Sequence, residues 1–173
     1  MKIIAFLKEY FHRIFWTMEK QARRAGVQMG EGNIIYTRFW SSEPYLITIG
    51  NHCQIVGGGR MFTHGGSAAV RDQYPDFDVF GKVTLGDYVY VGYNAMIMPG
   101  VTIGDHVIVA AGSVVTKSFP SNVVVGGNPA RVICSIEEYL KKNEPYNVGT
   151  KNYNSLQKKK ILLSLPENKF VKK

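Results

Sequence analysis

The sequence has 173 residues, of which 45% are hydrophobic and 20% are charged, as in one ordinary globular domain. Its formal net charge of +8 would suit nucleic acid, but no nucleic-acid motif accompanies the charge, which therefore favours a solvated basic surface that attracts a phosphorylated cofactor. The two cysteines, Cys53 and Cys134, exclude a disulfide framework or a cysteine zinc site, because their number and spacing fit neither.

The first predicted element is a helix over residues 3–24. Its apolar residues recur at helical spacing, and its charged residues lie largely off that face. We expect this amphipathic helix to pack over the rest of the chain or against a neighbouring subunit, with a membrane-surface anchor as the alternative. The apolar run before Lys8 is too short for a secretory signal or a membrane span, which predicts a cytoplasmic protein.

A repeat of six residues organises the centre of the chain. It is most regular over residues 83–118, which read VTLGDY VYVGYN AMIMPG VTIGDH VIVAAG SVVTKS. The third residue of each block is aliphatic and the first is Val, Ala or Ser, a period that neither a helix nor a flat strand produces. A short strand with two inward side chains and a tight turn does produce it when the chain keeps coiling in one direction. The repeat therefore predicts a solenoid.

The same repeat extends upstream with interruptions. It begins irregularly at Met29 and slips across residues 38–45. It returns in phase at three positions, Ile49, Ile55 and Met61. Cys53 then falls on the small inward position, which makes it a core residue rather than a nucleophile. Residues 63–80 are turn-rich and too polar for inward positions, which predicts a loop that leaves the solenoid.

The repeat ends after Arg131. Residues 135–143 predict a short helix that begins at the N-cap Ser135, with Glu138 three residues further on. After a polar connection, residues 153–165 predict a second short helix with exposed lysines.

The hexapeptides and their continuation GSVVTKSFPSNVVVGGNPARVI, residues 112–133, resemble the hexapeptide-repeat acyltransferases, and among these the acetyl-CoA-dependent O-acetyltransferases of sugars and polysaccharides. The resemblance covers residues 29–134 and implies a mainly β fold, a left-handed parallel β-helix with coils of about 18 residues. An N-terminal helical segment, residues 1–28, and a C-terminal helical extension, residues 135–173, would flank it. The resemblance also implies acetyl-CoA as the acetyl donor, no metal and a homotrimer.

Acetyl transfer to a hydroxyl needs a base for the hydroxyl proton and a donor for the developing oxyanion. Histidine suits the first role, because its unperturbed pKa of about 6.5 leaves much of it neutral. His12 lies on the predicted N-terminal helix, and His52 and His106 fall on exposed turn positions, so we assign these three no catalytic role. His64 ends a strand where the irregular loop begins, which is where the resembling acetyltransferases carry their catalytic histidine.

The group that orients His64 is left open. Family members often have an acidic residue soon after this histidine, where this chain has Gly65 and Gly66. The candidates are therefore Asp76, Asp78 or a backbone carbonyl, any of which could hold the imidazole tautomer.

The resemblance also assigns the acetyl-CoA contacts. Tyr93 and Ala111 match residues that contact the pantetheine arm. Thr116 and Lys117 match positions near the nucleotide end, and Arg131 matches a basic residue that meets the phosphates.

The spacing of these residues divides them between two edges of a three-sided coil. Tyr93 and Ala111 are 18 residues apart and stack on one edge, about 4.8 Å from each other. His64 and Lys117 are 53 residues apart, just short of three coils, and fall together on another edge. One chain therefore offers two halves of a groove, and three copies around one axis would join them.

The favoured function is O-acetylation of a surface-polysaccharide or lipopolysaccharide building block. An N-acetyltransferase of an amino-sugar nucleotide, a serine acetyltransferase and an antibiotic acetyltransferase on the same fold stay open as alternatives. A zinc-dependent carbonic anhydrase would need three ligand histidines on adjacent coils, which the positions of His52, His64 and His106 do not provide. A non-catalytic solenoid scaffold on acidic membrane would have no use for the ending at residues 116–131.

Overall fold

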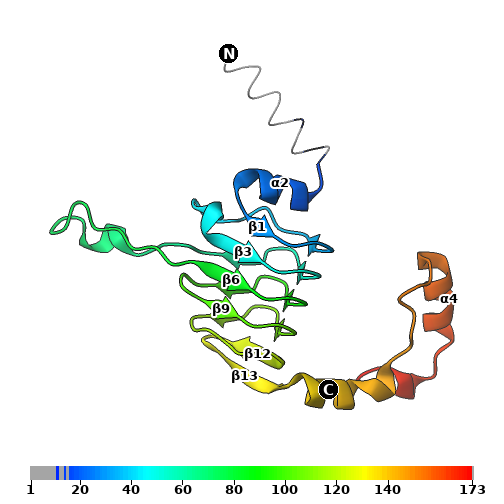
Figure 1. The fold of residues 1–173 in the computed structure, drawn as a ribbon. Helices are drawn as coiled ribbons and strands as arrows, with labels where there is room; N and C mark the ends of the chain where they lie inside the picture. Colours follow the sequence, from blue (N-terminus) through cyan, green and yellow to red (C-terminus); the bar gives the residue numbers. More distant parts are fainter. Residues whose placement is uncertain (1–10, 12–13, 15, 173) are drawn as a thin grey trace. The chain divides into compact units, whose positions relative to one another are not determined.

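The computed structural model describes Phe11, Ile14 and residues 16–172 (Figure 1). The chain divides into two compact units, one that ends at Ile136 and one that begins at Glu137. The first unit carries all the strands, and the second is helical.

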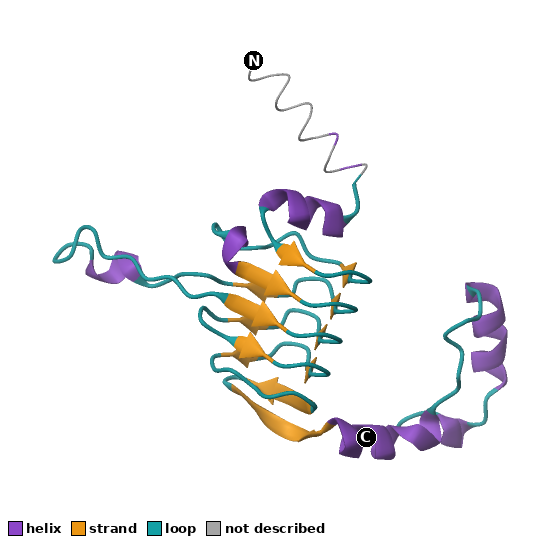
Figure 2. Ribbon diagram, viewed as in Figure 1, coloured by secondary structure: helices purple, strands orange, loops and turns teal. Residues whose placement is uncertain are grey.

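The first unit is a stack of coils, each made of short strands joined by tight turns (Figure 2). In chain order the strands are β1 (Gln28–Met29), β2 (Ile34–Ile35), β3 (Ile47–Ile49), β4 (Gln54–Ile55), β5 (Arg60–Met61), β6 (Val83–Leu85), β7 (Tyr90–Val91), β8 (Met96–Ile97), β9 (Thr102–Ile103), β10 (Ile108–Val109), β11 (Val114–Val115), β12 (Val123–Gly127) and β13 (Ala130–Ser135).

These strands form three sheets, one on each side of the coil. Sheet A has the order β1-β3-β6-β9, sheet B the order β13-β12-β10-β7-β4-β2, and sheet C the order β11-β8-β5. Neighbouring strands are parallel except β12 and β13, which are antiparallel. We name the turns after the sheets they join, so that edge AB runs from sheet A to sheet B, and edges BC and CA follow.

The predicted inward positions are the core of the stack. All six third positions of the regular repeat and all six first positions are at most 1% exposed: Leu85, Val91, Ile97, Ile103, Val109 and Val115, and Val83, Val89, Ala95, Val101, Val107 and Ser113. Each such aliphatic side chain contributes about 1.5–3 kcal/mol by its burial, which is why two positions per hexapeptide suffice to hold a coil.

Cys53 belongs to this core, as its phase in the repeat predicts. Its side chain is fully buried, and its thiol donates to the carbonyl of Gly86 at 3.1 Å. Burial raises the pKa of the Cys53 thiol, which keeps it protonated and unreactive.

Helix α2 (Met18–Ala25) lies over the first coil and buries Ala22 (Figure 1). It begins at Thr17, whose backbone is extended and whose hydroxyl accepts from the N–H of Lys20 at 3.2 Å. The prediction of one helix across residues 3–24 is therefore wrong at Thr17. Most of the residues upstream, including His12, lie outside the described part of the chain.

A long loop leaves the stack between β5 and β6, where the repeat lapses (Figure 1). It contains one short 3-10 helix, η2 (Ser67–Val70). Its two ends are paired, because His64 and Phe80 form an antiparallel bridge and the N–H of Gly81 donates to the carbonyl of Thr63 at 2.7 Å.

The second unit contains α3 (Ile136–Asn143), η3 (Glu144–Tyr146), α4 (Ser155–Ser164) and η4 (Glu167–Lys169). Helix α4 begins with a capping box, in which Asn154 and Gln157 each accept from the other's backbone N–H. In the described residues, none of the helices has the length and apolar character needed to cross a membrane.

The rows of inward side chains predict that two neighbouring residues of one strand contribute very differently to the free energy of unfolding. Ile97→Ala in β8 should lower the free energy of unfolding by about 2–5 kcal/mol, because it leaves a cavity in the stack. Met96→Ala, on the outward face of the same strand, should cost clearly less. Urea denaturation compares the two, and equal losses would contradict the inward assignment.

Candidate active site

Edge CA carries a polar cluster built from two successive coils. Thr63 and His64 lie two and three residues after the end of β5. Ser41 and Glu43 lie on the same edge of the preceding coil, ahead of η1 (Pro44–Leu46). Thr63 is fully buried, the Glu43 side chain is 16% exposed and the His64 side chain is 36% exposed. The imidazole is therefore the accessible end of an otherwise covered cluster.

Glu43 holds the cluster together. Its Oε2 atom is 2.7 Å from Nδ1 of His64 and accepts from the hydroxyl of Thr63 at 2.6 Å. The Thr63 hydroxyl also lies 2.8 Å from Oγ of Ser41, which in turn accepts from the N–H of Thr63 at 3.2 Å. Ser41 can take this place because its backbone is left-handed, with a φ of 61°.

The proton positions in this cluster follow from which of its groups can donate a hydrogen bond and which can only accept one. A carboxylate only accepts and a hydroxyl has one proton, so the Thr63 proton serves Glu43, and the Ser41 hydroxyl is left to donate to Thr63. Nδ1 of His64 must then carry the proton that Glu43 accepts. In the neutral imidazole this contact selects the tautomer in which Nε2 is the acceptor, the form that a general base needs.

Glu43 is held in its ionised form. The hydrogen bond from Thr63, ahead of the contacts with His64, keeps the pKa of Glu43 below its ordinary value, and partial burial opposes this shift without reversing it. A carboxylate that stays charged is a constant partner for the imidazole.

Glu43 is the orienting group that sequence reasoning missed. One of the predicted candidates, Asp78, is engaged elsewhere: it accepts from the hydroxyl of Ser67 at 3.1 Å and lies 3.8 Å from Arg71, both within the loop. One sequence feature could have pointed to Glu43, namely the slip of the repeat across residues 38–45. Such a slip means that the coil has extra residues on edge CA, and the side chain of an extra residue can contact the next coil.

The other described histidines stand on edge AB, away from this cluster. His52 and His106 both have positive φ values, 55° and 53°, and their rings stack on Tyr88 between them at 4.8 and 4.9 Å. They are members of a turn ladder, as the sequence predicts.

Tyr93 and Ala111 lie on edge BC of neighbouring coils. The N–H of Gly112 donates to the carbonyl of Tyr93 at 2.8 Å, which joins the two turns, and Ala111 is exposed. The ring of Tyr93, 58% exposed, extends over Gly57 of the coil before. At these coils edge BC is thus an exposed strip of backbone that carries the ring of Tyr93.

Thr116 and Lys117 extend β11 onto edge CA and are exposed. Because β5, β8 and β11 are successive strands of sheet C, Lys117 lies two strand spacings, about 10 Å, from the level of His64. Its amino group lies 5.7 Å from the ring centre of Phe119. Arg131 is exposed on β13, with one guanidinium N–H donated to the carbonyl of Ala130 at 2.9 Å.

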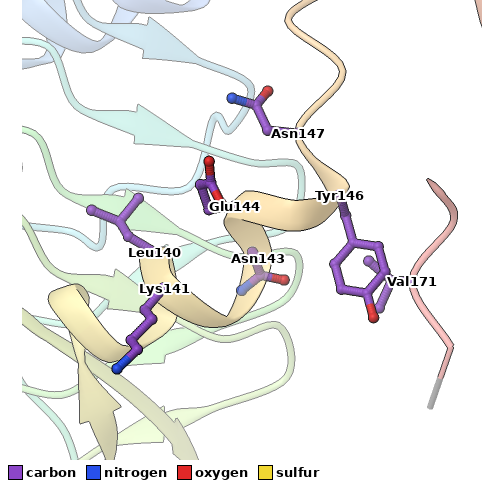
Figure 3. A pocket seen from close by; sticks show the side chains of 7 residues that line it. All are labelled: Leu140, Lys141, Asn143, Glu144, Tyr146, Asn147 and Val171. Atoms are coloured by element: carbon purple, nitrogen blue, oxygen red, sulfur yellow. The ribbon is translucent and has the colours of Figure 1, made fainter. Parts of the chain in front are cut away.

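A separate hollow lies within the C-terminal unit (Figure 3). It has a volume of about 810 Å³, and its lining includes the apolar side chains of Leu140, Tyr146 and Val171 beside Lys141 and Glu144. None of the described residues that line it is a histidine or a cysteine. Among the described residues, no three His, Cys, Asp or Glu side chains are grouped so that they could hold a metal ion. The cluster around His64 is therefore the candidate active site.

The chain is similar to proteins of one family. The description "Bacterial transferase hexapeptide (six repeats)" matches residues 82–117. Protein CapG of Staphylococcus aureus is 45% identical over 161 residues, which are 88% of this chain and 91% of CapG. The chain belongs to the hexapeptide-repeat acetyltransferases.

Two further likenesses agree with this assignment. The galactoside O-acetyltransferase of Escherichia coli is 50% identical over 97 residues, 56% of this chain but only 47% of that enzyme. A solved hexapeptide-repeat acetyltransferase of Vibrio cholerae superposes with a TM-score of 0.57 at 27% identity, over 66% of this chain and 77% of that one, and another structure of it contains acetyl-CoA. The predicted left-handed parallel β-helix and the predicted enzyme class are thus confirmed.

The depressed pKa of Glu43 predicts a pH-dependent contribution to stability. A group whose pKa is lowered by folding stabilises the native state above its unfolded value, about 4.3 for Glu, and loses this effect as the pH falls through the folded value. The difference in Tm between wild type and Glu43→Gln should therefore shrink between about pH 6 and about pH 3. Glu31→Gln reports the general cost of losing one exposed carboxylate. If the difference in Tm between wild type and Glu43→Gln stayed constant over this pH range, the lowered pKa of Glu43 would be contradicted.

Proposed function

We propose that this acetyltransferase moves the acetyl group of acetyl-CoA to a hydroxyl of a sugar, with His64 as general base. The observation that carries the proposal is the 2.7 Å hydrogen bond between Nδ1 of His64 and Glu43 at an accessible position of edge CA. An imidazole held in one tautomer by a carboxylate is the arrangement that general-base acyl transfer requires. The sugar acceptor is supported by the similarity to the galactoside O-acetyltransferase.

In the proposed reaction both substrates are bound together. Nε2 of His64 takes the proton of the acceptor hydroxyl while that oxygen attacks the thioester carbonyl. The imidazolium is stabilised by Glu43 and then returns the proton to the sulfur as the carbon–sulfur bond breaks. The products are the acetyl ester and the free thiol of coenzyme A, with no covalent enzyme intermediate and no metal.

The acetyl donor is proposed to lie along two edges. Tyr93 and Ala111 would contact its pantetheine arm on edge BC, and Thr116 and Lys117 its nucleotide end on edge CA. Arg131 would meet the phosphates, a role in which a guanidinium makes paired, charge-assisted hydrogen bonds.

Sheet C separates edge BC from edge CA in one chain, so the proposed contacts cannot close around one ligand within it. We infer a homotrimer in which edge CA of one subunit faces edge BC of the next. The acceptor is proposed to be a building block of a surface polysaccharide or lipopolysaccharide, and the cytoplasm, where acetyl-CoA is made, is the proposed place of reaction.

Removing the proposed base should abolish most of the activity but should leave the binding of coenzyme A intact. His64→Ala should lower turnover by about 10² to 10⁴-fold, while coenzyme A still shifts the melting temperature. Glu43→Gln should lower turnover by less, since the base remains and only its orientation is weakened. His52→Ala and His106→Ala are the matched controls on edge AB and should retain turnover. Steady-state rates with acetyl-CoA and a panel of sugars test this, and a loss with His106→Ala equal to that with His64→Ala would overturn the assignment.

Shared sites predict complementation between two inactive chains. His64→Ala removes the base on edge CA, and Ala111→Arg fills the donor strip on edge BC. Mixed trimers should regain part of the activity, because some interfaces then join an intact edge CA to an intact edge BC. A chain that carries both changes, mixed with itself, is the control. No recovery in mixed trimers that light scattering shows to have formed would place the whole site within one chain.

A further inference from the structure

Most of the net charge of the chain lies in its C-terminal unit. Residues 137–173 contain nine lysines, four glutamates and no arginine or aspartate, which gives +5 of the formal net charge of +8. The segment 145–166 has four lysines and no acidic residue at all, and helix α4 lies within it (Figure 1). The surface of this segment therefore attracts polyanions.

Helix α4 has apolar residues on two different faces. Ile161 and Leu162 are partly buried. Leu156 and Leu163 are seven residues apart, so at 3.6 residues per turn they point within about 20° of each other on the other side of the helix. Their side chains are 76% and 78% exposed, more than any other large apolar side chain in the described part of the chain. One exposed leucine is ordinary, whereas two that are aligned on one helix face indicate a contact surface.

Two lysines border this row of leucines. From the period of the helix, Lys159 and Lys160 lie about 60° and about 40° to either side of Leu156. Both side chains are exposed, and among the described residues no salt bridge reaches either of them. A lysine can lay its aliphatic stem along an apolar boundary and keep its ammonium group among phosphates. A row of leucines between lysines is therefore typical of a helix that lies in the interface of a membrane.

This combination of side chains favours a lipid surface over two other partners. The same face of a second copy would bring lysines against lysines, because the segment 145–166 offers no acid to pair with them. A nucleic acid would pair with the lysines and leave the leucines in water. An anionic bilayer uses both, since the leucines enter between the headgroups while the lysines meet the lipid phosphates.

We propose that α4 binds the surface of an anionic membrane through Leu156 and Leu163, with Lys159 and Lys160 at the lipid phosphates. The helix has ten residues and is about 15 Å long, so it lies in the plane of the headgroups and does not cross the bilayer. The inference goes beyond the proposed function and does not depend on it, because none of the four side chains belongs to the site around His64.

Vesicle binding by the full-length chain tests this. The protein is sedimented with sucrose-loaded vesicles of one part phosphatidylglycerol to three parts phosphatidylcholine, and with vesicles of phosphatidylcholine alone. Wild type should bind the first kind and bind the second at least about tenfold more weakly. Leu156→Ser combined with Leu163→Ser, and Lys159→Gln combined with Lys160→Gln, should each lower the partition coefficient about tenfold or more, since one pair loses apolar insertion and the other loses charge.

Two matched controls remove the same chemistry from the first unit. Val79→Ser combined with Val132→Ser removes two exposed apolar side chains, and Lys20→Gln combined with Lys82→Gln removes two lysine charges. Both control variants should bind the vesicles as wild type does, because neither changes α4. His64→Ala should also bind as wild type does, which keeps the result separate from that of the proposed function.

Four results would overturn the inference. The first is no binding to the vesicles that contain phosphatidylglycerol, and the second is an equal loss in the α4 variants and in their controls. The third is full binding by the leucine variant, which would mean a purely electrostatic contact such as one with nucleic acid. The fourth is a changed oligomeric state of the leucine variant in sedimentation velocity, which would mean that a second copy of the chain covers this face.

Discussion

Register between successive coils is the constraint on which the rest of this structure depends. Parallel strands stay paired only while equivalent residues face each other, and a slip of one residue would turn the buried row outward. The chain prevents this slip by stacking aliphatic side chains, so that Ile49 pairs with Leu85 and Leu85 with Ile103. The turns inherit the same register: the N–H of Asn51 donates to Asp87 at 2.7 Å, and that of Asp87 to Asp105 at 2.8 Å.

Because the turns stack, a residue's place in the coil of 18 residues decides which edge it occupies. That is why the fold and the position of His64 could be predicted from the sequence, and why His52 and His106 could be set aside. Glu43 could not be found in this way, because residues 38–45 depart from the repeat and their register depends on a left-handed turn at Ser41. The break at Thr17 was hidden for a different reason, since an extended cap residue does not disturb the apolar spacing around it.

The geometry of a three-sided coil also explains why one chain carries an incomplete groove. Edges BC and CA flank sheet C, whose outward face lies between Tyr93 and Lys117. A ligand that uses both edges of one chain would have to cross that face, whereas a neighbouring chain can bring its own edge opposite. Assembly is therefore a requirement of the proposed site and not an addition to it.

The irregular parts of the chain collect on one edge. Edge AB is regular from coil to coil, with His52, Tyr88 and His106 stacked along it. The two segments that depart from the repeat both lie on edge CA. They are the residues before η1, which include Glu43, and the long loop that follows His64. The regular coils keep the two departures in register, so that Thr63, buried in the stack, can tie Glu43 in place by a hydrogen bond of 2.6 Å. Rigid coils thus fix His64 and Glu43 relative to each other, while the loop beside them lies outside the stack, where a change of sequence would leave the coils intact.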